Sequence, residues 1–243
     1  MTTEKAYKLL ALQENISNRA AKDLIDRGVV SLSGQKVLLA RADVDVKKTF
    51  KIQPIAKAKI LFEDDKILAV DKPAFLSTEE VAKDFQATLL HRLDKETSGV
   101  LLFTKDEEFH AQAIKAFKNK EVKKEYIAVV CGKLIESLEI DKPLITLKKG
   151  NVAYTKVSKQ GKEAITYVEP LMLEGHYSKV LVFIQTGRTH QIRAHLKSAN
   201  FPILGDTLYG GKPAKRVMLH AHKIALLGYE FTSKEPKEFA KFI

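Results

Sequence analysis

The apolar positions of the first 50 residues predict two short helices followed by short strands. The first helix ends near Gln13. The second begins after Ser17, a good N-cap residue, and ends at Gly28, which readily adopts the left-handed C-cap conformation. Apolar runs then flank Ser33-Gly34, a dipeptide that suits a hairpin turn. Together these patterns predict a small α/β module at the start of the chain.

Residues 53–59 interrupt this periodicity, and Pro54 stands where neither a helix nor a strand ladder continues easily. We therefore divide the chain into a small domain over residues 1–54 and a larger one over residues 55–243. A chain of 243 residues suits one large domain with a small appendage.

Short apolar runs bounded by turn residues predict the strands of the larger domain. The predicted strands cover residues 60–62, 67–70, 100–104, 126–130, 143–147, 164–168, 180–184 and 217–222. Residues 106–119 predict an amphipathic helix, and residues 77–90 predict a short, partly helical segment. A further helical face is formed by Ile192, Leu196 and Ala199.

The stretch His91-Arg92-Leu93-Asp94-Lys95-Glu96-Thr97-Ser98-Gly99 runs directly into the apolar residues 100–104. Asp94 is therefore expected on a loop held against the core, with Gly99 giving the backbone freedom for close packing. A carboxylate fixed in this way is suited to act as a nucleophile or general base. The alternative is an aspartate that only caps the turn through Thr97 and Ser98.

Two further groups of charged residues stand out. Arg193 follows Ile192 and is expected near the edge of its helix's packed face, where a planar guanidinium can pair with a carboxylate in bidentate fashion. A basic ridge of Lys118, Lys120, Lys123 and Lys124 leads into the predicted strand at Tyr126. The ridge is either a phosphate track or an ordinary solvated face.

The formal net charge of +11 favours a polyanionic partner, most often nucleic acid, over a merely basic protein. Apolar residues make up 45% of the chain, but no apolar run approaches a membrane span and no signal segment follows the N-terminus. Cys131 is the single cysteine, which suits a reducing compartment. We therefore expect a cytoplasmic protein that has no membrane contact.

The sequence contains no pattern typical of a metal or cofactor site. His190 and His195 are five residues apart, which does not place them on one helix face, and His220 and His222 have no acidic or thiol ligand nearby. The glycines from Gly205 to Gly211 do not form a P-loop, and no dinucleotide-binding or nucleophile-elbow motif occurs.

The N-terminal pattern of two helices and a hairpin resembles an S4-type RNA-binding module. This resemblance implies that the second helix, with Arg19 and Lys22 on its polar side, and the hairpin grip RNA backbone. Ser33-Gly34 and Ala42-Asp43 stand where the family usually has Asn-Gly and Gly-Asp. The alternative is a small packing domain with solvated charges.

Three longer motifs resemble the RluA-type family of RNA pseudouridine synthases. They are His91 to Gly99, Lys123-Lys124-Glu125-Tyr126, and Thr186-Gly187-Arg188-Thr189-His190-Gln191-Ile192-Arg193. Lys72-Pro73, Pro202 to Asp206 and Leu219-His220-Ala221 also match, so that the resemblance covers about residues 58 to 230 in the right order. Only about 17 residues separate Pro73 from His91, a shorter segment than is typical of the family.

The resemblance implies roles for individual residues. Asp94 corresponds to the catalytic aspartate, Tyr126 to the residue that stacks on the target base and takes part in proton transfer, and Arg193 to the basic residue that pairs with the aspartate. The expected substrate contacts are Arg92, Arg188, Leu219, His91 and Lys72, and the expected RNA contacts outside the pocket are Arg19, Lys22, Lys123 and Lys124.

The implied fold is α+β, with a mixed, largely antiparallel central sheet, flanking helices and the S4-like domain. The implied activity is the isomerisation of uridines in structured RNA, ribosomal or transfer RNA, by a monomer that needs no cofactor and no metal. The target base must leave its stack before its glycosidic bond can be reached. Two alternatives are a binding protein of ribosome assembly and an RNA phosphodiesterase that uses Asp94 with His91 or His190.

Overall fold

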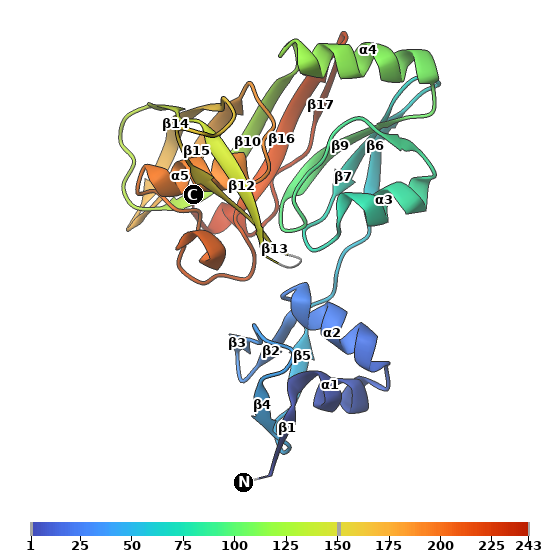
Figure 1. Ribbon diagram of the computed structural model, residues 1–243, viewed down its shortest axis with the longest axis vertical. Helices are drawn as coiled ribbons and strands as arrows, with labels where there is room; N and C mark the ends of the chain where they lie inside the picture. The colour runs from blue at the N-terminus through green and yellow to red at the C-terminus, as the bar shows by residue number, and fades with distance from the viewer. Residues whose placement is uncertain (1, 150–151, 243) are drawn as a thin grey trace. The chain divides into compact units, whose positions relative to one another are not determined.

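The computed structural model describes residues 2–149 and 152–242. Its internal contacts divide the chain into two compact units, residues 1–56 and residues 57–243, so the division falls two residues after the predicted boundary. Each unit is described by itself (Figure 1). None of the described helices has the length and apolar character needed to cross a membrane.

The first unit consists of two helices and two small sheets. Its elements are β1 (Thr3–Lys5), α1 (Ala6–Glu14), α2 (Asn18–Asp26), β2 (Val30–Leu32), β3 (Gln35–Lys36), β4 (Asp43–Asp45) and β5 (Phe50–Ile52). β1 pairs with β4, and β2 lies between β3 and β5. The Ser17 hydroxyl accepts a hydrogen bond from the backbone N–H of Ala20, which confirms the predicted N-cap of α2.

The second unit is built on one large sheet. The strands of the second unit are β6 (Lys59–Glu63), β7 (Leu68–Lys72), β8 (Thr88–Leu89), β9 (Ser98–Thr104), β10 (Lys123–Cys131), β11 (Leu138–Asp141), β12 (Leu144–Lys149), β13 (Val152–Val157), β14 (Ile165–Glu174), β15 (Tyr177–Ile184), β16 (Leu219–Leu226) and β17 (Tyr229–Thr232). Its helices are α3 (Thr78–Phe85), α4 (Glu107–Lys118), α5 (Gln191–Ser198) and the 3₁₀ helices η1 (Thr207–Tyr209) and η2 (Phe239–Phe242).

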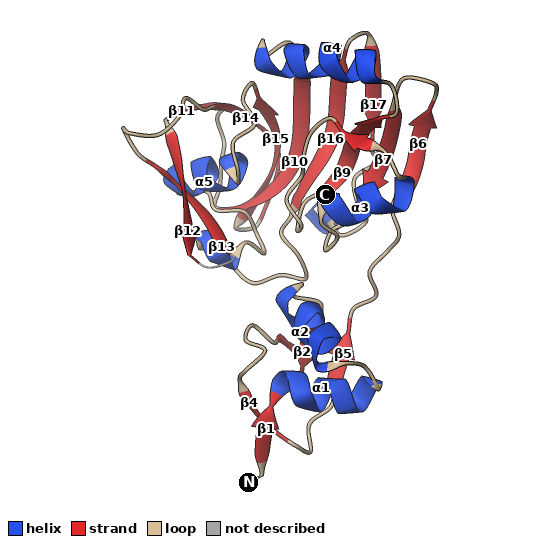
Figure 2. Ribbon diagram, turned by 45° about the vertical axis from the view of Figure 1, so that its right-hand side comes forward, coloured by secondary structure: helices blue, strands red, loops and turns tan. Residues whose placement is uncertain are grey.

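The strand order along the main sheet is β11-β14-β15-β10-β16-β9-β7-β6, with β17 paired to β16 and β8 to β9 (Figure 2). β9 and β16 run parallel, and the other pairs formed by the described strands of this sheet run antiparallel. The predicted α+β fold with a mixed, largely antiparallel sheet is therefore confirmed. β12 and β13 form a separate hairpin.

Both faces of the sheet are covered around β9, whose seven residues are all buried. On one face Leu101 and Phe103 pack in the same apolar cluster as Val81 of α3. On the other face Leu102 packs with Phe109, one of the buried residues of α4. Because neither face of β9 meets water, its sequence is continuously apolar instead of alternating.

Gly99 lies where β9 first meets β16. Its φ is +116°, and a Cβ atom built there would lie 2.1 Å from the carbonyl oxygen of Ala221. Glycine is therefore required both for the backbone conformation and for the close approach of the two strands. The predicted role of Gly99 is confirmed.

Candidate active site

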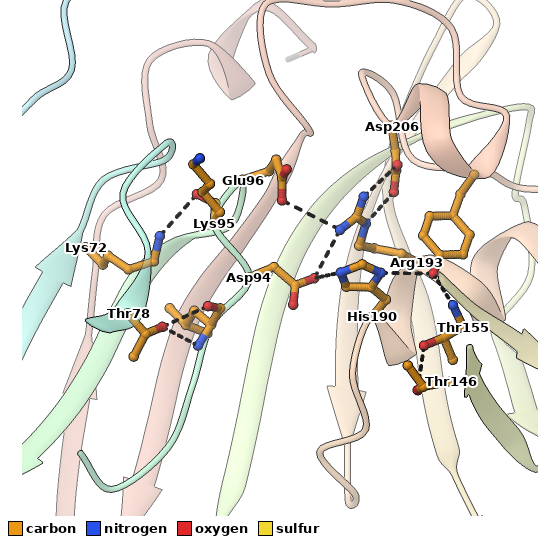
Figure 3. A network of polar contacts seen from close by, with 12 residues as sticks. Lys72, Thr78, Asp94, Lys95, Glu96, Thr146, Thr155, His190, Arg193 and Asp206 are labelled. Carbon is orange, nitrogen blue, oxygen red and sulfur yellow. Dashed lines mark hydrogen bonds and ion pairs between the residues drawn. The ribbon is translucent and has the colours of Figure 1, made fainter. Parts of the chain in front are cut away.

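Asp94 lies on the loop between β8 and β9, and buried polar groups fix that loop from behind. The Thr78 hydroxyl donates to the carbonyl oxygen of Leu93 at 2.8 Å and accepts from its N–H at 3.1 Å. The backbone N–H of Phe75 donates to the carbonyl oxygen of Lys95 at 2.7 Å. Phe75, before α3, and Thr78, the first residue of α3, therefore hold the residues on both sides of Asp94 in place; the contacts of Thr78 are drawn in Figure 3.

The Asp94 carboxylate points at the Arg193 guanidinium, whereas the backbone carbonyl oxygen of Asp94 closes the turn. The backbone N–H of Thr97 donates to the Asp94 carbonyl oxygen at 3.0 Å. The carboxylate accepts from Nη1 of Arg193 at 3.3 Å, and Nε2 of His190 lies 3.8 Å from the same oxygen. The carboxylate is therefore directed at Arg193 and His190, which leaves it available for chemistry.

Arg193 is more deeply buried than the apolar pattern of its helix predicts, with only 3% of the residue exposed. Its Nε and Nη2 donate to the two carboxylate oxygens of Asp206 at 2.6 and 2.9 Å. Burial lowers the pKa of Arg193, but the hydrogen bonds and charge of Asp206, with the charges of Asp94 and Glu96, outweigh it and raise that pKa above the ordinary value. The guanidinium is permanently charged and held in one orientation.

The predicted bidentate pair exists, but Asp206 is its partner. Asp94 receives the remaining Nη1 group of Arg193 (Figure 3). This division of contacts lets Asp206 fix the guanidinium while Asp94 stays partly exposed, with 24% of its side chain accessible.

Gln191 fixes the start of α5. Its Oε1 accepts from the Thr186 hydroxyl at 2.7 Å and from the Arg188 N–H at 3.1 Å. Its Nε2 donates to the Ile165 carbonyl oxygen at 2.9 Å. A buried glutamine with all of these partners ties the loop after β15 to the neighbouring strand β14.

Adjacent strands bring the site together. β15, β10, β16 and β9 are consecutive in the sheet, so the loop before α5, Tyr126 on β10, Leu219 on β16 and the Asp94 loop before β9 lie next to one another. In the register of these strands Tyr126 faces Ala221, and His220 faces Ser98. Residues that are distant in sequence therefore meet at one point.

A small pocket of about 80 Å³ opens at this point. Its lining includes six of the predicted catalytic and substrate-contacting residues, namely Asp94, Tyr126, Arg193, Arg92, Arg188 and Leu219. Burial raises the pKa of Tyr126 above its ordinary value, and the charge of Asp94 adds to this effect, so the phenol stays neutral at physiological pH.

Two arginines stand at the rim of the pocket. Arg92 is largely exposed and forms an ion pair with Glu79 at 2.5 Å, and Nε of Arg188 donates to the Glu163 carbonyl oxygen at 3.1 Å. Exposed ion pairs of this kind contribute little free energy. Arg92 can therefore exchange Glu79 for a substrate group at low cost.

Two predicted substrate contacts, His91 and Lys72, lie outside the lining of the pocket. The His91 ring accepts from the backbone N–H of Leu102 at 3.2 Å and lies against Phe117, outside the lining of the pocket. Burial, with the nearby charge of Lys124, lowers the pKa of His91 to about 3, so this histidine is a neutral structural group.

Lys72 is the other predicted substrate contact outside the pocket lining. It is fully buried, and its amine donates to the carbonyl oxygens of Pro73, Leu76 and Lys95. Burial, with the charge of Arg216, lowers its pKa to about 7. Lys72 supports the loop that carries Asp94, because its amine is enclosed by backbone carbonyl groups that include Lys95.

The predicted basic ridge is not a continuous exposed surface. Lys123 is exposed, but Lys124 is half-buried and its amine lies 3.4 Å from the Thr186 carbonyl oxygen. Burial lowers the pKa of Lys124 to about 8. Lys120 forms an ion pair with Glu163 at 2.7 Å. Of the two lysines predicted to contact RNA here, Lys123 has the exposure that such a contact needs.

The sequence alone indicates no role for Asp206 or Tyr209, and it offers His190 only as a rejected metal ligand and as an alternative acid or base for RNA cleavage. Asp206 and Tyr209 flank a turn after Gly205, in a segment that looked like an irregular loop. The available signal for Asp206 was its place directly after Gly205, in a stretch that matches the family. Within residues 2–149 and 152–242, no cluster of three or more His, Cys, Asp or Glu side chains is suited to hold a metal ion.

Comparison with known proteins agrees with this geometry. The family model of RNA pseudouridylate synthase matches residues 57–198, which include Asp94, Tyr126 and Arg193. The chain belongs to the RNA pseudouridylate synthase family. The protein is therefore an enzyme of the isomerase class that acts on RNA, and the first unit lies outside the matched region.

Relatives of this pseudouridine synthase extend over most of its length. An uncharacterized RNA pseudouridine synthase of Helicobacter pylori is 53% identical over 240 residues, covering 97% of this chain and 99% of the relative. The ribosomal large subunit pseudouridine synthase C of Rickettsia typhi is 36% identical over 85% of this chain and 74% of its own length. These relatives support the RluA-type resemblance.

Solved structures agree with the fold of the pseudouridine synthase unit. The structure of human RNA pseudouridylate synthase domain containing 1 has 25% identity and a TM-score of 0.66, and the match covers 76% of this chain and 87% of that one. Human RNA pseudouridylate synthase domain containing 4 has 23% identity and a TM-score of 0.63.

Proposed function

We propose that this enzyme converts specific uridines of large-subunit ribosomal RNA to pseudouridine, with Asp94 as the nucleophile. The observation that carries the proposal is the meeting of Asp94, Tyr126 and Arg193 at one pocket. The carboxylate attacks either C1′ of the ribose or C6 of the uracil. By either route the bond from C1′ to N1 is replaced by one from C1′ to C5, C5 loses its proton and N1 gains one, so that no cofactor or metal is required.

The environment of each group suits its part in this reaction. Arg193 gives the nucleophile an opposite charge at 3.3 Å and so orients it. Tyr126 offers the extruded base an aromatic face. Its neutral phenol can donate a proton, and it can accept one only after its own proton has passed to a nearby base. Leu219 adds an apolar wall, and Arg92 at the rim is placed to enter the space that the base leaves in the RNA stack.

The choice of ribosomal RNA rests on what the relatives are named for, because several of them are ribosomal large subunit pseudouridine synthases. We expect the enzyme to act in the cytoplasm, where ribosomes are assembled. Transfer RNA is the alternative substrate.

Pseudouridine mapping of total cellular RNA tests this proposal. We expect one or more large-subunit sites to lose pseudouridine completely when the gene is deleted and to regain it when the gene is restored. Unmodified large-subunit RNA, transcribed in vitro, should be modified by the purified enzyme at the same sites. If the deletion removes pseudouridine only from transfer RNA, the assignment to ribosomal RNA is wrong. If the deletion changes pseudouridine in no RNA, the enzyme does not form pseudouridine in this cell.

We also propose that the first unit binds RNA through a groove of about 400 Å³ beside α2. The groove is lined by Lys22, Asp26 and Arg41, with the exposed side chain of Leu39 at its edge. Arg19 is exposed on the same helix, and the Lys22 amine lies 4.2 Å from the centre of the Tyr7 ring. The positive charges of Arg19 and Lys22 beside an open surface are suited to contact the phosphate groups of an RNA backbone.

Neutralising Arg19 and Lys22 should weaken RNA binding and reduce its salt dependence. In the full chain, Arg19→Gln with Lys22→Gln should lower the slope of log K against log[salt] by about 1.5, because each lost phosphate contact removes roughly 0.7–0.9. Binding to a large-subunit RNA transcript across a salt series measures this slope. Lys8→Gln is the matched control, since Lys8 pairs with Glu4 and does not line the groove. If the double variant and Lys8→Gln show the same salt slope, the groove beside α2 is not an RNA-binding surface.

A further inference from the structure

Tyr209 connects the hairpin β12–β13 to the catalytic groups. Its hydroxyl oxygen accepts from the backbone N–H of Thr155 at 2.8 Å and lies 3.0 Å from Nδ1 of His190. The centre of its ring lies 5.0 Å from the Arg193 guanidinium, and the Tyr154 ring stacks on it. Tyr209 is almost fully buried, and burial raises its pKa above the ordinary value, so the hydroxyl keeps its proton.

The hydrogen bonds decide how the protons are arranged. A backbone N–H can only donate, so Thr155 makes the Tyr209 oxygen an acceptor. The Tyr209 proton is then available to Nδ1 of His190, 3.0 Å away, and we infer the tautomer in which this nitrogen accepts it. When Nδ1 of a neutral imidazole accepts, Nε2 carries the hydrogen. The group that faces Asp94 is therefore an N–H donor, with Nε2 3.8 Å from the carboxylate oxygen (Figure 3).

We propose that His190 is a positioning residue for Asp94, and that Tyr209 acts through His190 by fixing the tautomer that presents Nε2–H to the carboxylate. The proposal rests on Asp94 being the nucleophile. At 3.8 Å the contact is longer than a hydrogen bond in the free enzyme. A movement of less than 1 Å on substrate binding makes it one, and Asp94 is then held between two donors, His190 and Arg193.

The charges around His190 agree with a neutral donor. Burial lowers its pKa, and Arg193 lowers it further, whereas Asp94, Glu96 and Asp206 oppose this; the net result is a pKa below the ordinary value. At neutral pH the imidazole is therefore uncharged. It can donate to Asp94 without competing with Arg193 as a second cation.

The backbone of His190 allows a clean pair of variants. Its φ is +51°, in the left-handed region that asparagine tolerates well. The asparagine side chain ends where Nδ1 of histidine stands and cannot reach Asp94, whereas the glutamine side chain extends to the level of Nε2 and brings an N–H group there. His190→Asn thus removes the donor without backbone strain, and His190→Gln restores it at a backbone conformation that suits glutamine less.

We expect His190→Asn to reduce kcat for pseudouridine formation by about tenfold or more with KM for RNA nearly unchanged, because misplacement of a reacting group costs rate in this range. His190→Gln should recover most of that loss. A purely structural role gives the opposite order, since asparagine is the better residue at this φ. Equal activity of His190→Asn and the wild type would overturn the proposal.

The part played by Tyr209 is tested by a double-mutant cycle. Tyr209→Phe keeps the ring stack and removes the hydroxyl; we expect a smaller loss of kcat than with His190→Asn, and no additional loss when the two are combined. Tyr154→Phe is the control, because its hydroxyl contacts only the Lys197 amine among the described side chains. Fully additive losses would show that Tyr209 does not act through His190.

An NMR titration of the histidine rings in the full chain needs no RNA and separates this inference from the proposed function. We expect Nδ1 of His190 to be unprotonated at pH 7 in the wild type. Removal of the Asp94 charge by Asp94→Asn should lower the pKa of His190, since that charge raises it. An unchanged His190 titration would overturn the positioning role even if the enzyme is active, and a clear shift would support it whichever RNA is the substrate.

Discussion

Replacement of Asp94 by asparagine is expected to abolish pseudouridine formation, with a loss of about four orders of magnitude or more in kcat, because an amide cannot serve as the nucleophile. The protein should still fold and bind RNA. Asp94 is partly exposed, and Arg193 keeps both bonds to Asp206 when Asp94 loses its charge. Single-turnover assays on the large-subunit transcript measure the chemical step.

The matched control is Asp65→Asn, which makes the same chemical change in the exposed turn between β6 and β7. It should retain wild-type activity. Thermal unfolding of both variants should match the wild type within about 1 °C. Substantial activity of Asp94→Asn would exclude Asp94 as the nucleophile, and rescue of a deletion strain by an inactive Asp94→Asn would show that RNA binding is the cellular role.

Removal of the Asp206 carboxylate should have the largest effect on stability. Asp206→Ala leaves the buried Arg193 guanidinium with Asp94 as its nearest partner, and breaking a buried pair in this way costs about 3 kcal/mol or more. For a unit of this size the melting temperature should fall by roughly 6–12 °C. Activity should fall as well, since Arg193 is no longer held against Asp94. Circular dichroism and the RNA assay measure the two effects.

A second substitution separates two causes of the expected loss of stability, the unpaired charge of Arg193 and the lost packing of Asp206. If the loss arises from an uncompensated buried cation, Asp206→Ala combined with Arg193→Met should be more stable than Asp206→Ala alone, because no charge is then left without a partner. The double variant should remain inactive. A double variant that is less stable than either single variant would show that packing around Asp206 is the main factor.

Local signals in the sequence predict the elements that position the site. The Ser17 cap, the buried run of β9 and the glycine at its start follow from short-range rules, because caps, buried strands and close approaches depend on neighbouring residues. The family resemblance added what such rules do not reach, namely that Asp94, Tyr126 and Arg193 meet. The fold and the composition of the pocket follow from these two sources together.

Contacts between distant segments could not be predicted in the same way. Arg193 pairs with Asp94 as the family resemblance implies, but the sequence did not indicate that Asp206, from the loop after α5, takes its bidentate bonds. Position in a matched motif also does not give the surroundings of His91 and Lys72. Both lie beside the catalytic loop, but one turns to Leu102 and the other to backbone carbonyls. Adjacency in sequence to a catalytic residue does not decide the direction of a side chain.

The parallel contact between β9 and β16 has a consequence for how the enzyme is made. Ser98, four residues after Asp94, accepts from Nη2 of Arg216 and bonds to His220, partners that lie 118 and 122 residues further along the chain. On the ribosome, this end of β9 therefore stays uncovered until residues 216–220 emerge, after most of the catalytic unit has been synthesised. A contact of such long range is slow to close. The enzyme should thus gain its activity only after β16 has been synthesised, and a chain truncated before β16 should remain without a formed active site.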